Sequence, residues 1–184
     1  AALVYRDNEY TVIPTEGGHT DFAPCNEIER ELLKYLQNKY EHVSYERVIS
    51  GIGLVNIFEY LKSTGKFEIS NELMKRIETG DSAAVISAEG VSRNSEICVK
   101  AIDIFVSVLG AQAGNMVLNF KATGGVYLGG GIPVKITDKL KEGLFLKAFL
   151  NKGRLSYLTE MTPVFIIKNE SAGSFGAAVI ANRL

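Results

Sequence analysis

A short polar loop near the start of the chain carries three side chains that could bind a small polar ligand. Glu16, His19 and Asp21 surround the flexible pair Gly17-Gly18. Carboxylates accept hydrogen bonds from hydroxyl groups, and a neutral imidazole both donates and accepts, which is the chemistry that a sugar requires. Two other interpretations stay open. The side chains could cap nearby backbone, or they could ligate a divalent metal, although no second His or Cys with ligand spacing lies nearby.

A further acidic residue, Glu46, follows Ser44 at the predicted start of a helix. The helix macrodipole favours an acidic residue at that position without any ligand, so Glu46 by itself indicates a structural role. His42 is interpreted in the same way, as a partner of the carboxyl-terminal end of the preceding helix.

Three consecutive glycines, Gly129, Gly130 and Gly131, end an apolar run that is typical of a buried strand. Glycines at the carboxyl end of a strand let a flat ring or a phosphate approach the backbone, and α/β sheets bind ligands at that edge. Close packing of a helix on the strand is the alternative. The spacing is neither that of a P-loop nor that of a dinucleotide fingerprint. Ser171 and Gly173, at the start of the last predicted helix, could offer N–H groups to an anion or a ribose.

The elements that must position these residues follow from periodicity and capping. Residues 3–5 and 10–13 predict a β-hairpin, and residues 125–128 and 163–167 predict two buried strands. Between the hairpin and the first buried strand, capping residues predict helices that begin near Asn26, Ser44, Ser70, Asp81 and Ser92.

The helix expected over residues 92–120 is apolar around most of its circumference, which predicts burial on more than one side. One helix between the buried strands would use Leu140, Leu144, Ala148 and Phe149 as its apolar stripe, and a last helix would span residues 173–183. This order predicts an α/β layered domain over residues 1–184, with a mixed sheet flanked by helices.

Composition excludes several classes of protein. With 184 residues, 46% hydrophobic and 22% charged, the chain has the composition of a packed globular domain. Its 20 basic and 21 acidic residues give a net charge of -1, so nucleic acid is not expected as a partner. No stretch is expected to span a membrane and no leader precedes the hairpin, which favours a cytoplasmic protein without a membrane partner. Two distant cysteines, Cys25 and Cys98, exclude a disulfide framework.

Three motifs taken together resemble the bacterial-type glucokinase family, in order and spacing, across nearly the whole chain. They are residues 15–24 (TEGGHTDFAP), 46–56 (ERVISGIGLVN) and 124–132 (GGVYLGGGI). The resemblance implies one lobe of an actin-like ATPase fold, related to ribonuclease H, with the active site in a cleft between two lobes. It implies that Glu16, His19 and Glu46 bind glucose.

The same resemblance implies that the glycine turn 129–131 contacts adenosine and that Ser171 and Gly173 close the nucleotide pocket. The reaction implied is transfer of the γ-phosphoryl group of MgATP to the 6-hydroxyl of glucose, in an enzyme that forms a homodimer. This chain departs from the family in lacking the amino-terminal lobe, which carries the aspartate base. Neither Asp21 nor Asp103 matches that base, so we expect no catalytic residue here and no activity from this chain alone. A non-catalytic actin-like module that binds a sugar or a partner is the alternative.

Overall fold

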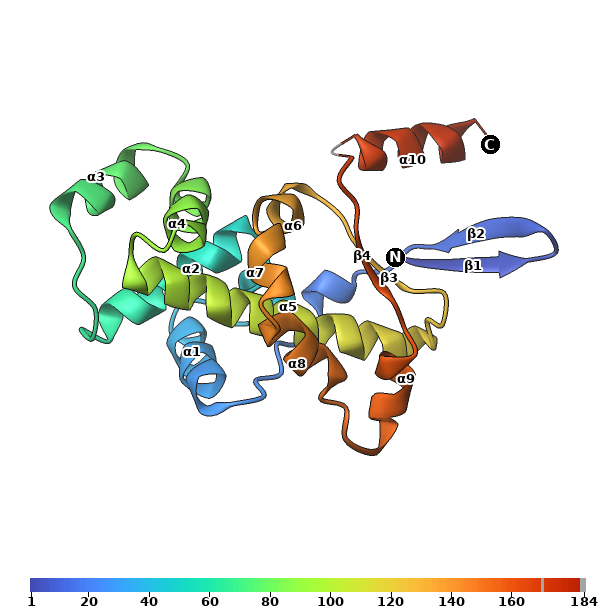
Figure 1. Ribbon diagram of the computed structural model, residues 1–184, viewed down its shortest axis with the longest axis horizontal. Coiled ribbons are helices and arrows are strands. Elements are labelled where there is room, and N and C mark those ends of the chain that lie inside the picture. Colours follow the sequence, from blue (N-terminus) through green and yellow to red (C-terminus); the bar gives the residue numbers. More distant parts are fainter. Residues whose placement is uncertain (170, 183–184) are drawn as a thin grey trace.

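A body of packed helices carries a projecting hairpin, a short pair of parallel strands and a separate last helix (Figure 1). The computed structural model describes residues 1–169 and 171–182. The strands are β1 (Ala2–Arg6), β2 (Glu9–Ile13), β3 (Val126–Leu128) and β4 (Val164–Ile166). The 3-10 turns are η1 (Gly17–His19), η2 (Tyr45–Arg47) and η3 (Gly153–Leu155). The α-helices are α1 (Glu27–Gln37), α2 (Gly51–Ser63), α3 (Asn71–Thr79), α4 (Ser82–Val91), α5 (Glu96–Phe120), α6 (Gly131–Lys135), α7 (Thr137–Lys141), α8 (Leu144–Leu150), α9 (Ser156–Glu160) and α10 (Ala172–Ala181).

Both predicted strand pairs form. β1 and β2 pair in antiparallel register, whereas β3 and β4 are parallel, with Leu128 opposite Ile166. The expected α/β class is therefore confirmed. The strands differ from the expected single mixed sheet, because within the described residues they make two separate two-stranded sheets. Hydrophobic periodicity predicts that a segment is extended, but it does not show which segments share a hydrogen-bonded ladder.

The long helix α5 is the centre of the core. Its residues are mostly buried, as its apolar circumference predicts, and α2, α4 and α8 pack around it. Gly110 and Gly114 lie where the backbone of α8 crosses, so close that a Cβ on Gly110 would overlap the carbonyl oxygen of Phe145. The sequence predicted no stretch long and apolar enough to span a membrane. That prediction is wrong, because α5 is long enough and apolar enough to do so by length and composition alone. Burial in the core accounts for its apolar character.

The predicted caps are largely confirmed. The side chains of Asn26, Ser70 and Asp81 each accept a hydrogen bond from a backbone N–H in the first turn of α1, α3 and α4. Ser44 precedes a 3-10 turn and makes no side-chain cap, and the long helix begins after Ser95.

The single helix expected between β3 and β4 is wrong, because three short helices, α6, α7 and α8, lie there, followed by the unpredicted α9. Gly143 has φ of +102°, a left-handed conformation that ends the preceding turn and starts α8. The stripe that suggested a continuous helix thus combines residues from α7 and α8. Leu140 and Phe149 of this stripe are buried in the core, whereas Leu144 is exposed.

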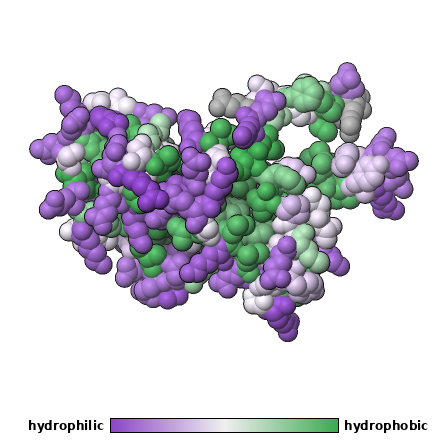
Figure 2. Space-filling view, viewed as in Figure 1, coloured by the Kyte–Doolittle hydropathy of each residue, from purple (hydrophilic) through white to green (hydrophobic). Residues whose placement is uncertain are grey.

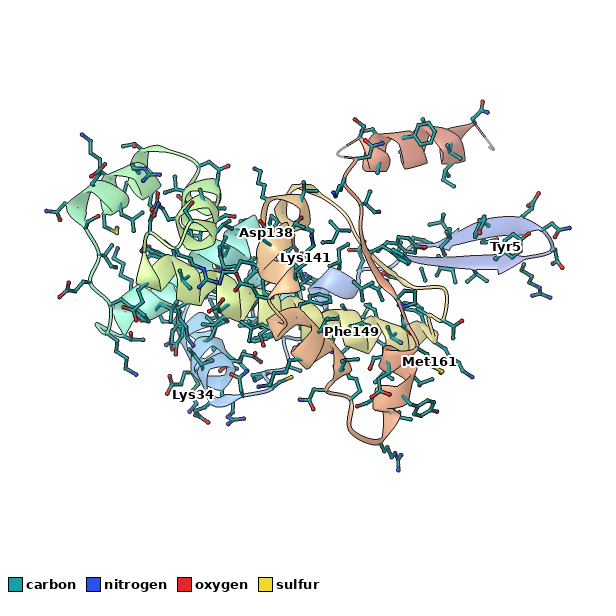
Figure 3. The ribbon with its side chains drawn as sticks, in the orientation of Figure 1. Tyr5, Lys34, Asp138, Lys141, Phe149 and Met161 are labelled. Atoms are coloured by element: carbon teal, nitrogen blue, oxygen red, sulfur yellow. The ribbon has the colours of Figure 1, made fainter. Side chains whose placement is uncertain are left out.

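The hairpin and α10 stand apart from the helical body (Figure 1). Tyr5 lies well out along the hairpin, whereas Phe149 lies where α8 crosses α5 (Figure 3). Apolar side chains gather over this end of the molecule in Figure 2, and none of the described residues of α10 is buried. The helix begins one residue earlier than predicted, and its predicted last residue, Arg183, lies outside the described residues.

Candidate functional site

Two turns that are distant in the sequence lie side by side. The backbone N–H of Phe22 donates to the carbonyl of Val43 at 2.9 Å, and that of Tyr45 donates to the carbonyl of Thr20 at 3.0 Å. These bonds form a short antiparallel bridge between the segment after η1 and the segment before η2. The bridge therefore brings the loop of Glu16 next to the turn that carries Glu46.

The three predicted sugar-binding residues present free polar atoms at this junction. Glu16, His19 and Glu46 are all exposed. Within residues 1–169 and 171–182, neither glutamate side chain makes a hydrogen bond or an ion pair, and Glu16 does not cap η1 with its carboxylate. Glu16 therefore gives no support to the interpretation that the side chains of this loop cap nearby backbone. The same lack of partners within the described residues holds for Glu46 on η2. Both carboxylates are available as acceptors for the hydroxyl groups of a ligand.

His42 is not the helix-end partner that the sequence suggested. α1 ends at Gln37, and the ring of His42 instead lies 2.8 Å from the Asp21 carboxylate, measured from Nε2 to Oδ1. The ring of His42 also contacts the ring of His19. The two ring centroids are 5.0 Å apart, at an interplanar angle of 59°. Sequence reasoning missed this contact because it depends on the bridge between the two turns.

The metal interpretation of Glu16, His19 and Asp21 finds no matching geometry. In the described part of the chain, no group of three or more His, Cys, Asp or Glu side chains is placed to hold a metal ion. Asp21 is directed to His42 instead.

A chain of partly buried hydrogen bonds supports η2. Nδ2 of Asn115 donates to the hydroxyl of Tyr45 at 3.2 Å, and Nζ of Lys152 donates to Oδ1 of Asn115 at 2.8 Å and to the carbonyl of Ala111 at 2.9 Å. Burial lowers the pKa of Lys152 and raises that of Tyr45. These residues come from η2, α5 and the segment between α8 and η3, and no sequence spacing links them. They hold the turn that carries Glu46.

The glycine turn 129–131 follows β3 directly, at the carboxyl end of the parallel strand pair. Gly130 has φ of +95°, which only glycine adopts readily. A Cβ on Gly130 or Gly131 would meet nothing within 4 Å, and one on Gly129 would lie 3.6 Å from Cδ1 of Ile167, an ordinary contact. Close packing within the chain therefore does not explain Gly131, and the space beside the turn is open to a ligand.

Ser171 and Gly173 follow the neighbouring strand at the same edge. The backbone N–H of Ile167 donates to the carbonyl of Leu128 at 2.9 Å, which keeps the two chain segments paired one residue beyond β4. The N–H of Ser171 donates to Oδ1 of Asn169 at 2.9 Å, and Gly173 is exposed in the first turn of α10. Glu170, which belongs to the same sequence motif, lies outside the described residues.

A largely apolar pocket of about 360 Å³ lies beside the glycine turn. Its lining includes the turn Gly129–Gly131 with Tyr127, Ile49, which follows η2, and Phe105 of α5. The side chains of Glu16, His19 and Glu46 are not part of this lining. An apolar hollow beside a glycine turn has the character of a site for a flat ring.

Solved structures define the class of fold. A crystal structure of a glucokinase from an Antarctic psychrotroph superposes with a TM-score of 0.82 at 27% identity, over 99% of this chain and 54% of that one. A glucokinase from Balamuthia mandrillaris, solved in complex with glucose, gives 0.75 at 22% identity, over 89% of this chain and 45% of that one. The domain therefore has the α/β fold of actin-like ATPases.

Sequence comparison gives the family. A sequence model of the glucokinase family matches residues 1–184. Glucokinases of Nostoc punctiforme and Colwellia psychrerythraea are 37% and 35% identical to this chain over 99% and 100% of its length, which is 57% and 54% of theirs. The chain belongs to the glucokinase family. It spans a little more than half the length of these relatives.

Proposed function

We propose that the full-length protein containing this chain is a glucokinase, which transfers the γ-phosphoryl group of MgATP to the 6-hydroxyl of glucose. The observation that carries the proposal is the placement of Glu16, His19 and Glu46 on two bridged turns, with both glutamate carboxylates unpaired within the described residues. Relatives named glucokinase and a neighbouring fold solved with glucose support it.

The sugar is bound by the three side chains in complementary roles. Glu16 and Glu46 accept hydrogen bonds from hydroxyl groups, and His19 both donates and accepts through its two ring nitrogens. Charge-assisted hydrogen bonds of this kind contribute about 1.5–3 kcal/mol each. Their function is to fix the hexose so that its 6-hydroxyl points at the phosphate, since phosphoryl transfer depends chiefly on positioning and charge neutralisation.

The nucleotide lies at the strand edge in this proposal. Gly129, Gly130 and Gly131 leave space for adenosine against the backbone, and Ser171 and Gly173 close the pocket from the start of α10. Bound Mg²⁺ neutralises charge on the ATP phosphates.

The catalytic base lies outside this chain in our proposal. Neither Asp21 nor Asp103 is free at the site, since Asp21 is bonded to His42 and Asp103 accepts from Lys139. We therefore expect the 184 residues alone to be inactive, and the complete enzyme to act in the cytoplasm as a homodimer. The burial of α5 within the helical body agrees with a soluble protein.

Steady-state kinetics of the full-length protein test the assignment. Glu16→Gln keeps the size of the side chain but removes its charge, so kcat/KM for glucose should fall roughly tenfold to a hundredfold, the equivalent of about 1.5–3 kcal/mol. Glu27→Gln is the matched control, because Glu27 is an exposed glutamate paired with Arg30 on α1. Unchanged kinetics for Glu16→Gln would contradict the proposed sugar site.

Calorimetry separates the enzyme from the non-catalytic module. The enzyme requires glucose binding together with turnover of ATP by the full-length protein. Glucose binding without any turnover, at every ATP and Mg²⁺ concentration tested, would instead support the module.

A further inference from the structure

His42 and Asp21 form a pair for which the proposed sugar site has no direct use. The Asp21 side chain is 91% exposed and that of His42 is 43% exposed, so the pair lies at the surface beside the site and not in the core. Their segments are joined by the backbone bridge between the two turns, which makes them cross-strand neighbours. His19 and His42 are also the two histidines of the whole chain.

The hydrogen bond to Asp21 determines how the His42 ring is oriented. An ionised carboxylate can only accept, so Nε2 of His42 must carry the proton at the 2.8 Å contact. The ring is held in one rotamer and with one nitrogen assigned as the donor. A carboxylate behind an imidazole commonly has this orienting function at binding sites.

The contact between the two rings transmits this orientation to His19. At 5.0 Å and 59° the rings meet in the tilted geometry that aromatic pairs favour. In the described part of the chain, the ring nitrogens of His19 make no hydrogen bond to protein, and the ring lies against that of His42. Both nitrogens remain available for hydroxyl groups of the ligand.

We propose that His42, oriented by Asp21, is a positioning residue that fixes the ring of His19 for sugar binding. This inference rests on the proposed function, because it assigns His19 to the sugar. The pair acts through His19 and does not touch the sugar itself.

A double-mutant cycle on the full-length protein tests the coupling. His42→Ala should raise the glucose KM about fivefold to tenfold, as expected when one hydrogen bond of the site is lost, with kcat and the ATP KM changed less than twofold. His19→Ala should raise the glucose KM at least as much. Because His42 acts through His19, the double variant should match His19→Ala within twofold. Effects that multiply would overturn the proposal, and so would a glucose KM within twofold of wild type for His42→Ala.

The conservative variant of Asp21 separates positioning from a general loss of structure. Asp21→Asn retains an oxygen that can accept from Nε2 of His42, whereas Asp21→Ala does not. We expect Asp21→Asn to keep the glucose KM within about threefold of wild type and Asp21→Ala to reproduce the His42→Ala value. Equal losses in both variants would refute the orienting role. The contrast between Asp21→Asn and Asp21→Ala can be measured even if His42→Ala does not fold.

A spectroscopic measurement distinguishes failure of this inference from failure of the proposed function. In full-length protein labelled with ¹⁵N-histidine, the signals of both rings are assigned with the His19→Ala and His42→Ala variants. His42 should show a protonated Nε2 in wild type, and His42→Ala should shift and broaden the ring signals of His19. If the protein shows these signals but has no kinase activity, the proposed function is refuted and the ring coupling still holds. Unchanged His19 signals in His42→Ala would refute the coupling, whatever the activity.

Discussion

Replacing Gly131 by alanine distinguishes a glycine retained for a ligand from a glycine retained for packing. Gly131 has no left-handed φ, and a Cβ built on it meets no other atom within 4 Å. Alanine also restricts the unfolded chain, which stabilises a compatible site by about 0.4–1 kcal/mol. We therefore expect Gly131→Ala to raise the melting temperature by roughly 1–4 °C, using about 2–4 °C per kcal/mol for a domain of this size.

The same substitution should damage nucleotide binding. The added methyl group projects into the open space beside the strand edge, where the proposed adenosine lies. Overfilling a close contact costs about 1–3 kcal/mol, so the KM for ATP should rise roughly tenfold to a hundredfold while the glucose KM stays within about twofold. The assays are thermal unfolding of the apoprotein and steady-state kinetics of the full-length enzyme.

Two other glycines calibrate the result. Gly176 is a helical glycine of α10 with nothing within 4 Å of its Cβ position, so Gly176→Ala should raise the melting temperature without changing the ATP KM. Gly125 has φ of +124° and a Cβ position 3.1 Å from the carbonyl oxygen of Pro163, so Gly125→Ala should destabilise by about 1–3 kcal/mol. If Gly131→Ala destabilises as Gly125→Ala does, or leaves the ATP KM unchanged, the ligand interpretation of Gly131 is refuted.

Two further predictions concern the helical body. Gly110→Ala would force a Cβ into the carbonyl oxygen of Phe145. We therefore expect the free energy of unfolding, measured in urea, to fall by about 1–3 kcal/mol, despite the better helix propensity of alanine. A rise would show that α5 and α8 are not in backbone contact. Hydrogen bonds from Lys139 and Arg93 lower the pKa of Glu142, so its contribution to stability is present above the pKa of the unfolded chain and is lost as the pH falls through the lowered folded value. The urea midpoint should therefore fall less between pH 6 and pH 3 in Glu142→Gln than in wild type, and parallel curves would contradict the pairing.

Local chemistry was sufficient to predict most of the elements. The cap at Asn26 is formed, and the polar turn between two β-rich runs makes the hairpin. These features depend on residues a few positions apart, which the sequence displays directly. The long helix was also predictable, because its apolar circumference permits only burial.

The errors have a common physical origin in backbone geometry and in contacts between distant segments. The left-handed conformation of Gly143 divides a stripe that otherwise fits one helix. The separation of the hairpin from β3 and β4 depends on ladder hydrogen bonds that periodicity does not encode. The sequence also suggested that glycines at 129–131 serve either a ligand or packing, and only the empty space around Gly131 distinguishes the two.

The site shows the same division between local and tertiary information. Glu16 and His19 are three positions apart within one loop, so their proximity was predictable, but the position of Glu46 near them depends on the bridge after Thr20. That bridge also gives His42 a different environment from the one predicted. By sequence it follows a helix, whereas in three dimensions it touches a candidate ligand-binding ring.

In the sugar site that we propose, the bridge joins two turns that are distant in the sequence. Each turn is a 3-10 segment of three residues, too short to fix a long side chain by its own hydrogen bonds. The backbone bonds after η1, the hydrogen bond from Asn115 to Tyr45 and the contact of the two histidine rings join and support the two turns. Rigid placement of polar groups lowers the entropic cost of binding a ligand that needs several hydrogen bonds at once. The sugar site that we propose consequently depends on these supporting contacts as much as on the side chains that touch the sugar.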